Sequence, residues 1–225
     1  MNERLPQVPY YWVKPQFDWA CTILPMIMPK THEPQTWPHK APDEELLKDL
    51  SRWRRFKYAF VSEIRWKPSE SWRELSRVIL LGVPVLWLLN LAATLVGNQF
   101  GFQAGMDSQP VLDMLEKNPV ALLALGALFA PLFEEFFFRV LPRTVGRWVR
   151  PSAVTMWPLG IVCTLLFALA HINPDNPTIP LPQFLTGLAL WAMQARFGYL
   201  GSVALHACFN GSLLLPAVLL AGKVQ

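Results

Sequence analysis

Long apolar blocks separated by short polar segments dominate the chain from Leu75 onward. At 1.5 Å per residue, blocks of this length approach or cross a hydrocarbon core of about 30 Å. We therefore predict an all-α fold: a polytopic transmembrane helix bundle of about five spans. The predicted spans are 75–97, 119–141, 153–171, 179–195 and 199–220. The segment 98–118 is predicted to be a loop.

The residues that precede these blocks have a different pattern. Prolines recur throughout 1–42, and because each removes an amide donor and clashes with the preceding turn, we predict a poorly ordered arm there. Residues 43–70 carry apolar positions at helical spacing beside a basic cluster, which predicts an amphipathic surface helix. Such a helix either lies on an anionic membrane surface or packs on the membrane domain. A Ser71–Glu74 capping box then opens the membrane domain, residues 71–225.

Charge and composition indicate a membrane protein rather than a nucleic-acid-binding one. The chain is 52% hydrophobic and 16% charged, with a formal charge of +4. Its Lys and Arg residues gather beside the apolar blocks, where such residues orient a protein in a membrane. Every second predicted loop is basic, including the loop after the second span, which contains Arg143, Arg147 and Arg150. This alternation predicts a cytoplasmic N-terminus and an external C-terminus.

Six polar residues lie in or at the ends of these apolar blocks. An ionised group near the bilayer centre costs roughly 2.5–3.5 kcal/mol on insertion scales, so such residues usually face a protein interior or a wet cavity. We therefore predict an intramembrane site. Its candidate residues are Glu134, Glu135, Arg139, His171, His206 and Asn210.

Helical geometry indicates which of these groups can meet. Glu135 and Arg139 are four residues apart and can form an ion pair, whereas Glu134 lies about 100° around the helix. Pro131, one turn earlier, predicts a local distortion beside the carboxylates. Taken alone, each polar pair is also explained by structural contacts between helices. The predicted spans place Glu134 close to the cytoplasmic edge and His171 near the opposite edge, so a shared site requires the third boundary to move or that helix to be displaced.

Three motifs on separate blocks carry a family resemblance: E-E-x-x-x-R at 134–139, F-x-x-x-H at 167–171 and H-x-x-x-N at 206–210. Together they resemble the CPBP (Abi) family of intramembrane proteases, which includes CAAX prenyl endopeptidases and proteins associated with bacteriocin self-immunity. The resemblance covers about 118–215. It implies an endopeptidase that cleaves a membrane-associated protein or peptide, in a bacterial cell membrane.

The resemblance also implies a role for each polar residue. Glu134 would be the principal base that activates water, with His171 as its partner. His206 and Asn210 would donate to the oxyanion, a role that suits their N–H groups. The last pair, Glu135 and Arg139, would hold the geometry.

Two alternatives remain beside this interpretation. A glutamate and two histidines are also plausible zinc ligands, but the H-E-x-x-H motif is absent and we expect no cofactor. The second alternative is a non-catalytic immunity or assembly protein that uses the same fold to bind a partner. A transporter is disfavoured because the blocks show no repeat. The sequence predicts neither the substrate nor the oligomeric state.

Overall fold

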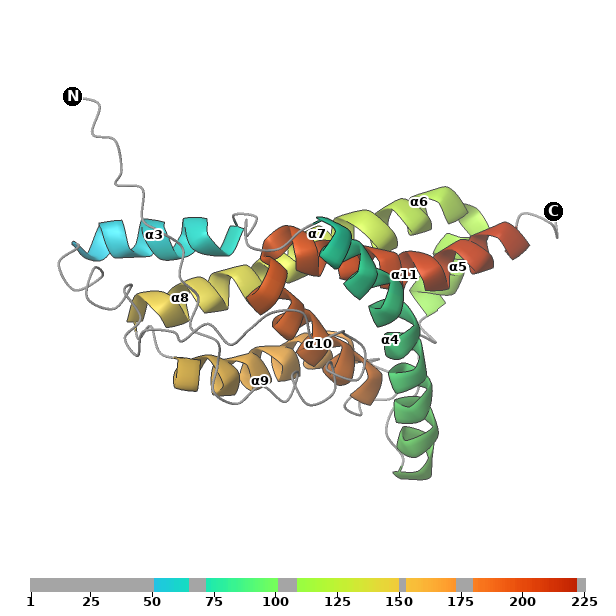
Figure 1. The fold of residues 1–225 in the computed structure, drawn as a ribbon. Helices are drawn as coiled ribbons and strands as arrows, with labels where there is room; N and C mark the ends of the chain where they lie inside the picture. The colour runs from blue at the N-terminus through green and yellow to red at the C-terminus, as the bar shows by residue number, and fades with distance from the viewer. Residues whose placement is uncertain (1–50, 65–71, 101–108, 150–152, 173–179, 222–225) are drawn as a thin grey trace.

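The computed structural model describes residues 51–64, 72–100, 109–149, 153–172 and 180–221, and every regular element in these ranges is helical (Figure 1). The predicted arm at 1–42, the beginning of the 43–70 helix and the Ser71 side of the capping box lie outside the described residues. The helices are α3 (Arg52–Ile64), α4 (Trp72–Phe100), α5 (Gln109–Lys117), α6 (Pro119–Ala124), η2 (Leu125–Phe129), α7 (Ala130–Glu135), η3 (Phe136–Val140), α8 (Leu141–Val149), α9 (Ala153–Leu169), α10 (Leu181–Phe197) and α11 (Tyr199–Ala221).

Among the described residues, three helices are long and apolar enough to cross a membrane, and the protein is an integral membrane protein. They are Trp72–Phe100, Pro119–Val149 and Tyr199–Leu220. Helices also form at the other two predicted spans, but α9 and α10 have 17 residues each. That corresponds to about 25 Å, which is short of a core of about 30 Å. Three of the five predicted spans thus meet the criterion of length and composition, and the shorter helices α9 and α10 lie at the positions of the other two.

Two boundaries differ from the predicted ones. The second span was predicted to end at Leu141, yet α6, η2, α7, η3 and α8 run on without a break to Val149. The predicted loop 98–118 contains the helix α5 and the last turn of α4. Asn118 separates α5 from α6, and its side chain caps α6 by accepting a hydrogen bond from the Ala121 amide at 3.0 Å.

Helix α3 lies alongside α8 (Figure 1). The ring of Phe56 meets Trp148 edge-on with centroids 5.8 Å apart, and Phe60 meets Phe136 in the same way at 6.3 Å. The Trp148 indole also donates to the carbonyl of Arg52 at 3.1 Å. Of the two interpretations of this amphipathic helix, these contacts support packing on the membrane domain.

A buried apolar cluster joins α4, α10 and α11. It consists of Leu75, Leu86, Leu190, Met193, Phe197, Leu205 and Phe209. A polar contact reinforces it, because the Asn90 amide on α4 donates to the Thr186 hydroxyl on α10 at 3.0 Å. The opposite side of α4 exposes leucines such as Leu80 and Leu88, as expected of a surface that faces lipid.

Candidate active site

Helix geometry around Pro131 is distorted, as the sequence predicts. In the π-helical turn η2, the Ala130 amide donates to the carbonyl of Leu125, five residues back. The next hydrogen bond with this five-residue spacing would run from the amide of residue 131 to the Gly126 carbonyl, but residue 131 is proline and has no N–H. The Asn210 side chain on α11 supplies it instead, donating to the Gly126 carbonyl at 2.9 Å.

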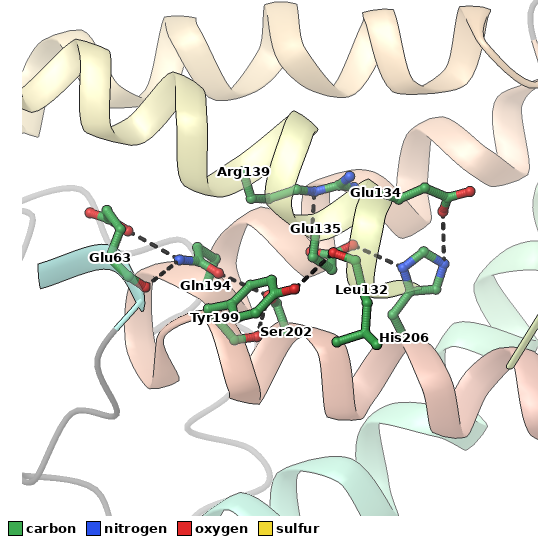
Figure 2. Close-up of polar contacts among 9 residues, drawn as sticks. All are labelled: Glu63, Leu132, Glu134, Glu135, Arg139, Gln194, Tyr199, Ser202 and His206. Carbon is green, nitrogen blue, oxygen red and sulfur yellow. Dashed lines mark hydrogen bonds and ion pairs between the residues drawn. The ribbon is translucent and has the colours of Figure 1, made fainter. Parts of the chain in front are cut away.

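Another π-helical turn, η3, follows directly after the two glutamates. Here the Leu141 amide donates to the carbonyl of Phe136. Glu134 and Glu135 therefore sit on the single α-helical segment α7 between two π-helical turns, an irregularity that often accompanies functional sites. The two carboxylates point to different surroundings (Figure 2).

Glu135 is a fully buried structural anchor. Its side chain has a relative exposure of 0%, and its Oε2 atom lies 3.4 Å from Nε of Arg139, which confirms the predicted ion pair. Its other oxygen lies 2.8 Å from Nδ1 of His206 on α11. Glu135 thus ties α7 both to the next turn of its own helix and to a neighbouring helix (Figure 2).

Glu134 lies between the two histidines. Its Oε1 is 3.7 Å from Nε2 of His171, and its Oε2 is 3.6 Å from Nε2 of His206. The side chain is 24% exposed and that of His171 is 33% exposed, whereas that of His206 is only 4% exposed. Glu134 and His171 therefore form the accessible side of the cluster, and His206 forms its buried side.

His171 reaches Glu134 because the second helix is longer than predicted. Helix α9 packs back along α8 and η3. Residues at similar distances before the end of α8 and after the beginning of α9 therefore come together. Glu134 lies about 22 Å of helix before the end of α8 at Val149, and His171 lies about 27 Å after the beginning of α9 at Ala153. The error in the sequence-based depth estimate was therefore the end of the second span, and not the boundary of the third.

Hydrogen bonds at Nδ1 distinguish the two histidines. Nδ1 of His171 lies 2.8 Å from the carbonyl of Phe167, and because a carbonyl only accepts, this nitrogen carries the proton. Nδ1 of His206 faces the Glu135 carboxylate and donates to it. Both Nε2 atoms therefore face Glu134. The two rings thus differ in the partner of Nδ1, which is a backbone carbonyl for His171 and a carboxylate for His206.

Arg139 is held by an aromatic ring as well as by Glu135. Its guanidinium lies 4.3 Å from the centroid of Phe167, so the F-x-x-x-H motif contacts both the arginine and His171. Gly187 on α10 leaves room for this arrangement. A Cβ there would lie 2.7 Å from Cγ2 of Thr164 and 3.3 Å from Nη2 of Arg139.

Replacing Gly187 with alanine is expected to destabilise the fold by about 1–3 kcal/mol, because the added methyl group overpacks this contact. Gly211→Ala is the matched control, since its Cβ would make only an ordinary contact of 3.7 Å with Ala127. Thermal unfolding in detergent measures both variants. Equal stability of the two would contradict the packing argument.

Asn210 is placed differently from the other predicted site residues. Its bond to Gly126 attaches α11 to the distorted turn η2, a role that the sequence did not predict. That bond uses one of the two N–H groups of the amide. Its predicted role in oxyanion binding therefore depends on the second N–H group.

Polar residues near the cluster were missed by the sequence analysis. The Tyr199 hydroxyl donates to the Leu132 carbonyl at 2.8 Å, and the Ser202 hydroxyl donates to Gln194 at 2.9 Å. Gln194 in turn contacts Glu63 on α3 (Figure 2). The sequence feature that could have identified Ser202 is its position, one helical turn before His206.

The residues of the cluster do not form a preassembled metal site. Within the described part of the chain, no three or more His, Cys, Asp and Glu side chains are arranged to hold a metal ion. Glu134, His171 and His206 converge, but each contact is a nitrogen facing a carboxylate oxygen.

A segment of the chain matches a known protein family. Residues 116–212 match the family described as type II CAAX prenyl endopeptidase Rce1-like. No curated protein and no solved structure matches the chain. The matched segment extends from α5 into α11 and includes all six predicted site residues.

Proposed function

We propose that the chain, whose residues 116–212 match the type II CAAX prenyl endopeptidase Rce1-like family, is an endopeptidase of the CPBP family of CAAX-protease-like membrane proteins. The proposed reaction is hydrolysis of a peptide bond in a membrane-associated protein or peptide. The observation that carries this proposal is the position of the Glu134 carboxylate between two imidazoles, with one carboxylate oxygen facing each Nε2.

Water activation is assigned to Glu134 and His171. A neutral His171 that keeps its proton on Nδ1 presents a lone pair at Nε2, next to an acceptor oxygen of Glu134. A water molecule that donates one hydrogen bond to each group has both protons directed at acceptors. Removing one of them leaves a hydroxide-like nucleophile, and positioned general bases of this kind contribute about 10²–10⁴-fold to a rate.

Stabilisation of the oxyanion is assigned to His206, assisted by Asn210. To donate from Nε2, His206 must be an imidazolium, and Glu135 balances this charge from the Nδ1 side at 2.8 Å. Arg139 in turn pairs with Glu135 and holds it in place. Preorganised donors in a water-poor site are worth more than in water, and each costs about 10²–10³-fold in kcat when removed.

The surroundings of Glu134 support a substrate that arrives from the membrane. Phe133 and Phe137, on the same helix as Glu134, are 61% and 55% exposed, as expected of rings that face lipid. We place the α3 end of the molecule on the cytoplasmic side, because Arg52, Arg54 and Lys57 lie there. The proposed substrate therefore enters sideways from the lipid.

The function is tested by incubating purified protein in detergent with a library of fluorogenic membrane peptides and identifying the products by mass spectrometry. Wild-type protein is expected to cleave members of the library, and Glu134→Ala is expected to cleave none. Resistance to a chelator would support the metal-free steps above. Equal cleavage by both proteins would refute the assignment of Glu134. Absence of cleavage across the library would favour the non-catalytic, partner-binding alternative.

A further inference from the structure

Glu63 is a buried carboxylate outside the Glu134 cluster. It lies on α3 with a relative exposure of 0%. One of its oxygens is 2.8 Å from Nε of Arg143, and the other is 2.6 Å from Nε of Arg147, both on α8. These contacts attach α3 to the far end of the helix that carries Glu134.

The same carboxylate is also connected to α11. Gln194 on α10 donates to the Glu63 backbone carbonyl at 3.0 Å and to its Oε2 at 3.2 Å. Its own side-chain oxygen accepts from the Ser202 hydroxyl at 2.9 Å. Ser202 lies one turn before His206 on the same helix, so this chain of contacts ends beside the candidate active site (Figure 2).

The helix that carries Arg143 also leads back to the other side of the Glu134 cluster. Arg143 lies four residues after Arg139, which pairs with Glu135. The Arg143 guanidinium also lies 5.1 Å from the ring centroid of Trp191 on α10. Glu63 is thus one of the points where the helix of Glu134 and the helices that support His206 are joined.

We propose that Glu63 is a positioning residue that couples the docking of α3 to the geometry of the active site. By holding α8 and α10 together, it sets the position of His206 relative to Glu134. This inference rests on the proposed function. It makes the cytoplasmic helix α3 part of the working enzyme, because displacing α3 would release both connections at once.

The coupling is tested directly on the histidine, without requiring cleavage. Full-length protein with ¹⁵N-labelled histidine is placed in lipid nanodiscs, and the ring signals of His206 are assigned by their loss in His206→Gln. Glu63→Gln is expected to shift the His206 ring signals by more than their line width. Glu116→Gln, which changes an exposed carboxylate on α5, is expected to leave them in place.

A purely structural role gives a different result. Lower stability alone changes the fraction of unfolded molecules and leaves the signals of the native protein where they are. If Glu63→Gln does not fold, Arg147→Gln decides the question, because it removes only the outer contact of Glu63 and leaves the contact with Arg143. Unshifted His206 signals in the folded variant would overturn the proposal.

Kinetics separate this inference from the proposed function. If the wild type cleaves a peptide from the library, Glu63→Gln should lower kcat with little change in KM, since α3 does not line the Glu134 side of the cluster. If the wild type cleaves no peptide, the histidine measurement still tests the coupling. The two proposals can therefore fail independently.

Discussion

Replacing Glu134 with glutamine is expected to lower kcat by about 100-fold or more while leaving the unfolding temperature nearly unchanged. Glutamine has the same shape but cannot accept the proton of the attacking water, and loss of a positioned general base costs about 10²–10⁴-fold. The side chain is 24% exposed and is not part of the buried Glu135–Arg139 ion pair. The measurement is steady-state cleavage of the best library peptide, together with thermal unfolding in the same detergent.

The matched control for this variant is Glu116→Gln, which makes the same chemical change on an exposed position of α5. It should retain wild-type kcat. A Glu134→Gln protein with more than a tenth of the wild-type kcat would show that another group is the base. A large fall in its unfolding temperature would show that the lost activity reflects misfolding.

Replacing the adjacent Glu135 with glutamine is expected to destabilise the protein by about 3–5 kcal/mol. Removing one partner of a buried ion pair leaves an uncompensated charge, and that is the cost such changes usually carry. Arg139 is 1% exposed and would lose its paired carboxylate, although its ring contact with Phe167 would remain. Reversible unfolding by denaturant in mixed micelles measures the difference.

A double variant distinguishes charge from packing in this pair. Replacing both partners of a buried ion pair with apolar residues of similar size is often neutral or stabilising. Glu135→Leu combined with Arg139→Met should therefore recover much of the stability lost in Glu135→Gln. It should not recover cleavage, because His206 would lose the partner of its Nδ1 atom. A double variant as unstable as the single one would contradict the charge explanation.

These two glutamates, adjacent in the chain, thus have opposite expected phenotypes. The difference follows from the turn of about 100° between neighbouring helical residues. One side chain points into the helix packing and meets Arg139, and the other points to the accessible side where His171 lies. Sequence reasoning separated the two because the i, i+4 relation identifies the structural one.

Local features were predicted well because they depend on few neighbours. The ion pair of Glu135 with Arg139 joins residues four positions apart on one helix. The distortion near Pro131 follows from a missing amide proton. Where helices occur was also predictable, since apolar blocks of this length have few other structures available in a membrane.

Features that depend on how helices end and pack were predicted poorly. The second helix continues past Leu141 because Arg143 and Arg147, which resembled loop residues, find a buried partner in Glu63. That partner lies 80 residues from Arg143 in the chain, and no local pattern indicates it. Arg143 and Arg147, two of the arginines used to assign a cytoplasmic loop, are therefore part of the packed structure.

The sequence by itself determined the helical class, the polar residues that a membrane would exclude, and the pairs among them that share a helix face. Only the tertiary structure decided that His171 and His206 both turn Nε2 toward Glu134, that Asn210 bonds to Gly126, and that α3 joins the site through Glu63. The physical reason is the range of the interactions. Helix formation and i, i+4 contacts are set within a turn, whereas the register between helices depends on packing and on ion pairs between distant segments.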